Sequence, residues 1–432
     1  MGYERIAWTS DDEAGDVTPV AGLDLGKAEL ACCVQRLDPD HPGRQVQQVS
    51  TWSTTTNSLT ELAGELVTVG VQLVAMEATS DYWKPVFYRL EAHGLNVIVV
   101  NAKHFKHLPG RPKTDKLDSQ WLARLAGKGL LRPSFVPPAD IRALRDLTRD
   151  RADLVDQRTG NKNRVEKLLE DACIKLSSVV SDTFGTSGRA MMEALIAGQR
   201  DPQVLAEMAL GRLRSKKNAL VEALTGMFTD RHGFRLRMLL DRIDALSSDI
   251  GKLDKAIDLA LEPYERQRHQ LAGIPGVGRT NAAAIIAEIG VDMTRFPTAG
   301  NLASWAKYAP GVNESAGKSK GSHATGKGNK YLARALGQSA VAARLTKTFL
   351  GDRYRRLSRR IGPPKAQTAV GRSILVGAWH LLQNPTAEWI DLGPDHHTHT
   401  HNPDRIKQTH LKALEALGYN VTLTPQQKSF SD

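Results

Sequence analysis

The chain has 432 residues, and its 58 lysines and arginines outnumber its 47 aspartates and glutamates, for a net charge of +11. Such an excess of positive charge favours an acidic partner such as a nucleic acid. The hydrophobic content of 41% is enough to bury cores, which excludes a mostly disordered protein. At roughly 100–200 residues per domain, the length predicts two or three domains.

Two further classes are excluded by the residue pattern. No window approaches the ~18 to 20 uninterrupted apolar residues of a membrane span, and the first residues lack a basic segment followed by an apolar one. Of the three cysteines, Cys32 and Cys33 are adjacent in a predicted strand, so their side chains face opposite ways and no disulfide framework is expected. We therefore expect a cytoplasmic protein that is neither exported nor embedded in a membrane.

The first domain is predicted at residues 18–138, after a loose acidic extension over residues 1–17. Apolar runs at Val20–Leu25 and Glu29–Leu37 are broken at a glycine-lysine pair, which indicates a hairpin. Further strands are predicted at Val71–Ala78 and Leu95–Ala102, and each follows a helical pattern. Alternating strands and helices indicate an α/β domain with partly parallel pairing.

Long helices are predicted over residues 139–270, where aliphatic residues recur at helical spacing among charges of both signs. Between residues 239 and 261 the aliphatic residues alternate in steps of three and four, which is the spacing of a coiled-coil seam. The members of this seam are Leu239, Ile243, Leu246, Ile250, Leu253, Ile257 and Leu261. The seam fits either a projecting, dimerising coiled coil or a helix packed on its own domain.

A third, mainly helical domain is predicted at residues 271–393. It begins with an apolar turn, Gly276-Val277-Gly278 and an alanine-rich helix, which resembles a helix-hairpin-helix unit whose glycines let backbone amides approach a DNA phosphate. Residues 394–432 are predicted to be a linker and tail. The linker contains four histidines, His396, His397, His399 and His401, which fit either a solvated segment or a transition-metal site.

Four acids of the first domain share a pattern that points to metal binding. Asp24 and Glu77 interrupt the ends of apolar strands, where burying a carboxylate is costly unless it meets a cation. Asp115 and Asp118 lie three apart at the start of a predicted helix capped by Thr114, so they share one face. Together they could supply the oxygen ligands of two Mg²⁺ ions, as a ribonuclease-H-like nuclease requires. Singly, each acid also fits a turn or capping role.

Basic residues gather in three places that fit nucleic-acid binding. The first is a loop of the first domain, the second a segment rich in glycine, serine and lysine near residue 320, and the third an arginine-rich helix near residue 355. The expected phosphate contacts are Lys103, Lys106, Arg111, Lys113, Lys318, Lys320, Lys327, Lys330, Arg355, Arg356, Arg359 and Arg360. The alternative for the first loop is an ordinary solvent-exposed surface that binds no ligand.

Ser315 is a candidate nucleophile in the serine-rich segment. Small neighbours would let a phosphate approach it, and Lys318 could stabilise the charge. Its neighbours include no obvious base, and Ser319 and Ser322 look equally available.

The ordered set of motifs resembles a known family. GLDLGK, VAMEATSDYW, KTDKLDSQWLARL, LAGIPGVGRT and PGVNESAGKSKG occur in this order over most of the chain. They resemble the DEDD-type transposases of the one-ten group of bacterial insertion sequences, which are RNA-guided bridge recombinases.

The resemblance implies a function for each part of the chain. The RuvC-like domain would bind Mg²⁺ through Asp24, Glu77, Asp115 and Asp118, and Ser315 would form a phosphoserine intermediate during strand transfer. It also implies double-stranded DNA as substrate, a structured noncoding RNA as guide, assembly into a dimer or tetramer, and association with the nucleoid.

Two other functions remain open at this point. One is a two-metal nuclease or junction resolvase, which would use water in place of Ser315. The other is an architectural DNA-binding protein, which would leave the four acids without a purpose.

Overall fold

The computed structural model describes residues 4–7, 19–38, 41, 44–101, 114–310, 314–315, 318–319, 326–396 and 403–423. The chain divides into two compact units, Met1–Val136 and Pro137–Asp432, and each is described by itself. Among the helices of these ranges, none combines the length and the apolar character that crossing a bilayer requires.

The first unit is a six-stranded mixed sheet in the order β1-β4-β3-β2-β5-β6. β2, β3 and β4 form an antiparallel meander, and β5 and β6 continue from β2 in parallel. This arrangement confirms the predicted α/β, ribonuclease-H-like domain. The strands are Glu4–Ala7, Val20–Leu25, Glu29–Leu37, Gln45–Ser53, Leu73–Glu77 and Val97–Val100, and the helices are α1 Thr56–Thr68, α2 Trp83–Ala92 and α3 Asp115–Gly127.

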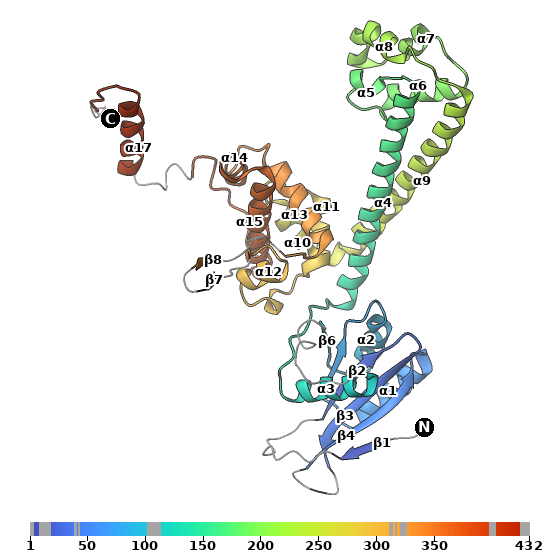
Figure 1. Cartoon of the computed structure of the whole chain (residues 1–432), viewed down its shortest axis with the longest axis vertical. Helices are drawn as coiled ribbons and strands as arrows, with labels where there is room; N and C mark the ends of the chain where they lie inside the picture. The colour runs from blue at the N-terminus through green and yellow to red at the C-terminus, as the bar shows by residue number, and fades with distance from the viewer. Residues whose placement is uncertain are drawn as a thin grey trace. The chain divides into compact units, whose positions relative to one another are not determined.

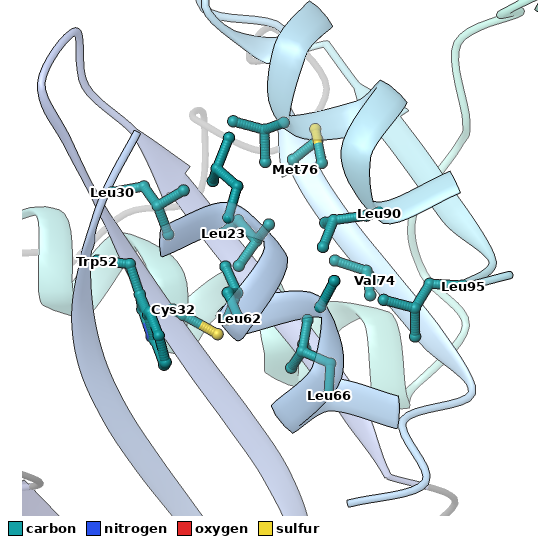
Figure 2. Close-up of a cluster of buried hydrophobic side chains, with 14 of the residues drawn as sticks. Leu23, Leu30, Cys32, Trp52, Leu62, Leu66, Val74, Met76, Leu90 and Leu95 are labelled. Atoms are coloured by element: carbon teal, nitrogen blue, oxygen red, sulfur yellow. The ribbon is translucent and has the colours of Figure 1, made fainter. Parts of the chain in front are cut away.

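The two faces of the sheet are covered by different helices. On one face, Leu23, Leu30 and Met76 pack against leucines of α1 and α2, and Figure 2 shows this cluster. On the other face, α3 packs through Ala123 and Ala126. Because successive residues of a strand point to opposite faces, alternate positions of β2 belong to different cores. The same rule places Cys32 and Cys33 in separate clusters, as predicted.

Two strands were not expected from the sequence. β4 is rich in glutamine and serine, so its apolar alternation is weak, yet it pairs with β3 along its full length. Glu4–Ala7 forms β1 against β4, which corrects the expectation of a loose extension over residues 1–17. A four-residue strand carries too little periodicity to be recognised, and its pairing comes from the exposed edge that β4 offers.

The second unit contains a long helical hairpin. α4 (Ala139–Asp171) and α9 (Asp230–Ala260) pack side by side, and the short helices between them in sequence lie at one end of the pair (Figure 1). Those short elements are α5 Leu176–Val179, α6 Thr186–Ile196, α7 Pro202–Glu207, the 3-10 helix Gly211–Lys216 and α8 Lys217–Leu224. They bury a core of their own with the adjoining ends of α4 and α9.

The predicted seam of α9 faces α4 of the same chain. Ile243, Ile250 and Ile257 are each 4% exposed. Arg151 forms an ion pair with Asp254, and Arg158 donates to Ser247 at 3.3 Å, so polar contacts flank the apolar seam. The packing of the helix within its own unit is therefore present, and a coiled coil between copies of the chain stays a prediction.

The rest of the second unit is helical, as predicted. α10, α12, α13 and α14 pack against the strongly apolar α15, and α11 packs against α13 and α4. The elements are the 3-10 helix Glu262–Tyr264, α10 Glu265–Ala272, α11 Arg279–Ile289, the 3-10 helix Met293–Arg295, α12 Ala299–Trp305, β7 Glu314–Ser315, β8 Lys318–Ser319, α13 Lys330–Ala343, α14 Phe349–Ile361, α15 Pro363–Gln383 and α17 Pro403–Ala416.

Candidate functional site

Two of the four predicted acids are neighbours at the edge where β2 and β5 end. The last residue pair of these parallel strands is Leu23 with Met76, and Asp24 and Glu77 are the next residues of their strands. Their side chains therefore lie side by side and point to the same face of the sheet. Asp24 is half-buried and Glu77 is 7% exposed. Both acids lie on the face that α3 covers.

The close approach of α3 to β2 depends on Gly22. A Cβ built on Gly22 would lie 2.3 Å from the carbonyl oxygen of Ser119 and 2.4 Å from the amide nitrogen of Ala123. At the other end of the helix, a Cβ on Gly127 would lie 3.5 Å from Val20. α3 therefore runs opposite to β2, and its first turn points toward the end of the strand that carries Asp24.

The distances covered along β2 and along α3 agree with this placement of the first turn. From Gly22 to Asp24 the strand advances about 6.6 Å, and from Ser119 back to Asp115 the helix rises about 6 Å. Asp115 and Asp118 both lie in that first turn, and Thr114 caps it by accepting a hydrogen bond from the Leu117 amide at 3.3 Å. Asp115 is exposed, whereas Asp118 is half-buried with its Oδ1 shielded from solvent.

The donor set at this edge has the chemistry of a hard-cation site. Its members are carboxylates only, and carboxylate oxygens are the ligands that Mg²⁺ and similar ions prefer. Within the described parts of the chain, no three His, Cys, Asp or Glu side chains are gathered closely enough to enclose an ion. The backbone brings the ends of β2 and β5 and the start of α3, which carry the acids, to the same edge. To enclose an ion, the acidic side chains would have to turn toward one another.

Ser315 lies in a short two-stranded hairpin of the second unit. It pairs with Lys318, and Glu314 pairs with Ser319, in antiparallel register. The register places the predicted nucleophile and the predicted charge-stabilising lysine opposite each other across the ladder.

The helix that follows this hairpin in sequence is anchored by a buried carboxylate. Glu288 of α11 is 1% exposed and accepts two hydrogen bonds from Arg149 of α4, at 2.7 and 2.8 Å. It also accepts a hydrogen bond from Nδ2 of Asn329, whose Oδ1 caps α13. Sequence reasoning missed this contact, because Glu288 lies in a helix whose sequence gives no sign of a buried partner.

The predicted phosphate-binding residues divide by the contacts they make. Arg355 donates to the backbone carbonyls of Arg344 and Thr346, at 3.0 and 2.9 Å, and so caps the end of α13. Lys330 lies 4.5 Å from the ring centroid of Tyr331. The exposed members of the set are Lys327, Lys330, Arg356, Arg359 and Arg360.

The two glycines of the predicted helix-hairpin-helix turn have different surroundings. Gly276 has a φ of +88°, and a Cβ on it would lie 2.2 Å from the carbonyl oxygen of Ser339. It therefore admits the backbone of α13 rather than offering a free amide surface. Gly278 is exposed, has nothing within 4 Å of its Cβ position and precedes α11, so it is the one of the pair that is open to a ligand.

Several predicted residues lie outside the described ranges. They are Lys103, Lys106, Arg111, Lys113 and Lys320, together with His397, His399 and His401. His396 is described, and its ring packs edge-on against Phe349 at 5.4 Å between centroids.

Comparison with known proteins bears on both units. Residues 21–174 match the DEDD transposase domain of the IS110 group, and residues 268–355 match a family described as "Transposase IS116/IS110/IS902 family". The insertion element IS116 44.8 kDa protein of Streptomyces clavuligerus is 26% identical over 275 residues, which are 59% of this chain and 68% of that protein.

A second relative and one solved structure are also similar. The insertion element IS110 43.6 kDa protein of Streptomyces coelicolor is 44% identical over 104 residues, so that match spans 24% of this chain and 25% of the relative. A structure of Thermus thermophilus RuvC is 14% identical with a TM-score of 0.21, and covers 27% of this chain and 100% of that chain.

Proposed function

Because the chain belongs to the IS116/IS110/IS902 family of insertion-sequence transposases, we propose that it cleaves and rejoins DNA with Ser315 as nucleophile and its four strand-end and helix-start acids as metal ligands. One observation carries the metal part of this proposal. The pairing of β2 with β5 makes Asp24 and Glu77 neighbours, on the face that α3 covers.

In the proposed reaction the acids, Ser315 and Lys318 would each have a separate role. Asp24, Glu77, Asp115 and Asp118 would hold two Mg²⁺ ions. When bound, Mg²⁺ neutralises charge on the scissile phosphate and favours the ionised serine hydroxyl. The Ser315 oxygen forms a bond to phosphorus as the bond from phosphorus to the leaving strand breaks. Lys318 would stabilise the added negative charge.

Rejoining reverses the first step on a new strand. A free strand end attacks the phosphoserine, its oxygen bonds to phosphorus, and Ser315 leaves as a hydroxyl. One phosphodiester is exchanged for another, so the reaction requires no ATP. The partners in this proposal are double-stranded DNA of the element ends and target, and a structured noncoding RNA that selects them. We further propose a dimer or tetramer that works at the nucleoid.

The serine mechanism is tested with matched serine variants. Ser315→Ala should abolish the denaturation-resistant protein–DNA adduct and strand transfer, because no other group would form the phosphoester. Ser319→Ala, which removes the hydroxyl of a residue in the paired strand β8, should retain both. The measurement is a denaturing gel of protein incubated with supercoiled element DNA, Mg²⁺ and the candidate RNA.

The acids are tested in the same assay. Asp24→Asn should lose both adduct and strand transfer while DNA affinity is kept, because it removes a ligand charge and not a phosphate contact. Strand transfer by Ser315→Ala at the wild-type level would contradict the serine mechanism. If the activity of Ser315→Ala were then lost on adding Asp24→Asn, the two-metal mechanism with water as nucleophile would be favoured over the serine mechanism.

A further inference from the structure

An open groove runs between α4 and α9, near the end of the hairpin where the short helices lie. Its volume is about 620 Å³, and a second recess of about 450 Å³ adjoins it, with Arg164 and Arg242 lining both. Four exposed cations line this space, the basic groove: Arg164 and Lys167 of α4, and Arg235 and Arg242 of α9.

None of the four cations is used in an ion pair within the described ranges. Arg164 donates a hydrogen bond of 3.4 Å to the neutral side chain of Asn161. Two acids also line these spaces, and each already has a cationic partner. Asp171 lies 3.9 Å from Arg231, and Asp249 contacts Lys252 at 2.9 Å. The positive charge of the groove is therefore left largely uncompensated.

Other cations of the same helical hairpin do form ion pairs with acids of the chain. On the side of α9 that faces α6, Arg237 forms ion pairs with Glu193 and Asp241, and Arg189 pairs with Glu193 and Asp244. The charges there are balanced within the chain. The groove side thus keeps an excess of positive charge that the side facing α6 lacks, as expected where an external anion binds.

The spacing of the cations fits a polyanion. Arg235 and Arg242 are seven residues apart on one helix face, about 10.5 Å along the axis, a length over which duplex DNA carries about six phosphates. Arg164 and Lys167 lie one turn apart on the other wall. Asp153, where α4 contacts the helix after the serine hairpin, is 14 residues from Lys167, so the groove lies about 20 Å further along α4.

We propose that the basic groove binds the phosphate backbone of duplex DNA, at a distance from the serine hairpin of several base pairs. The choice of DNA rests on the proposed function, since DNA is the polymer that a transposase must bind. This contact would extend the footprint of the protein along DNA beyond the site of strand exchange, and it would be independent of base sequence.

The experiment measures the salt dependence of binding with the full chain. Affinity for a 40-base-pair duplex is followed by fluorescence anisotropy between 50 and 200 mM salt, for wild type and for Arg235→Gln/Arg242→Gln. Each lost phosphate contact should lower the slope of log affinity against log salt by about 0.9. Two lost contacts give about 1.8, so over this fourfold salt range wild-type affinity should fall about 12-fold more than that of the variant.

A matched control removes the same charge outside the groove. Lys255→Gln/Arg266→Gln replaces two exposed cations that do not line the groove or pair with its acids, and it should keep the wild-type slope. All variants change exposed side chains, and unchanged circular dichroism and melting temperature would show that they fold.

Three results would overturn the proposal. The first is a wild-type slope in the groove variant, and the second is an equal loss in the control. The third is a loss of affinity for duplex RNA, or of self-association in light scattering, while the slope for DNA is unchanged. The measurement involves no strand cleavage, so a failure of the serine mechanism would not affect it.

Discussion

Single residues set the geometry of both candidate sites. Gly22 is the clearest case, because any side chain there would meet the backbone of α3 at 2.3 Å and move the helix that carries Asp115 and Asp118. A glycine inside an apolar strand is a sequence sign of close backbone approach. Gly22 lies inside the apolar run of GLDLGK and so carries this sign, although the sequence does not say which element makes the approach.

Glu288 gives a prediction about stability at the same scale. Its carboxylate is buried against Arg149 and Asn329, so Glu288→Gln would leave the Arg149 guanidinium partly buried without its counter-charge. We expect the free energy of unfolding of the second unit to fall by about 3–5 kcal/mol, as measured by denaturant titration.

An exposed acid of the same unit serves as the control for this change. Glu262→Gln, in the 3-10 helix before α10, should change the free energy of unfolding by about 0.5 kcal/mol or less. Equal effects of the two substitutions would show that the Glu288 contacts do not stabilise the protein.

Between elements, ion pairs join α6 to α9 beside the core of the short helices. Burial alone would raise the pKa of Glu193, but hydrogen bonds from Arg237 and Arg189 outweigh it and hold the pKa below its usual range. A carboxyl whose pKa is lower in the folded chain stabilises the fold above its unfolded pKa. That contribution is lost as the pH falls through the folded pKa.

The acid dependence of this contact can be measured. Glu193→Gln should lower the melting temperature at pH 6, and the difference from wild type should shrink as the pH is lowered from about 4.3, the ordinary pKa of glutamate, toward 3. Differential scanning calorimetry at steps of half a pH unit follows it. A difference that stays constant over this range would mean that the ionised form of Glu193 is not what stabilises α6 against α9.

At the scale of the whole molecule, each unit has a buried core of its own. Leucines of β2, α1 and α2 form one in the first unit, and the ends of α4 and α9 form another with the short helices of the second. The four acids belong to the first unit, whereas Ser315 and the basic groove belong to the second. A change that acts on the acids should therefore be visible in the unfolding of the first unit.

Metal binding should stabilise that unit selectively. A ligand that binds only the folded state adds about 2.7 kcal/mol at a concentration 100 times its dissociation constant. Mg²⁺ should therefore raise the melting temperature of the first unit in wild type, and chelation should reverse the rise. In Asp24→Asn the rise should be absent, and an undiminished rise would place the ion elsewhere.

The sequence by itself determined the local order of this protein and the identity of its candidate chemical groups. The alternation in Val20–Leu25 and Glu29–Leu37 and the spacing of Asp115 and Asp118 are local signals, so the β-hairpin and the shared helix face could be predicted from them. The aliphatic repeat of α9 predicted its buried seam for the same reason.

Only the tertiary structure decided which distant residues meet. The alignment of Asp24 with Glu77 depends on the register of two strands about fifty residues apart, and the use of Gly276 depends on the approach of α13. The basic groove depends on which cations of α4 and α9 find acids elsewhere in the chain. Such contacts follow from packing over long separations, and no local repeat of residue types encodes them.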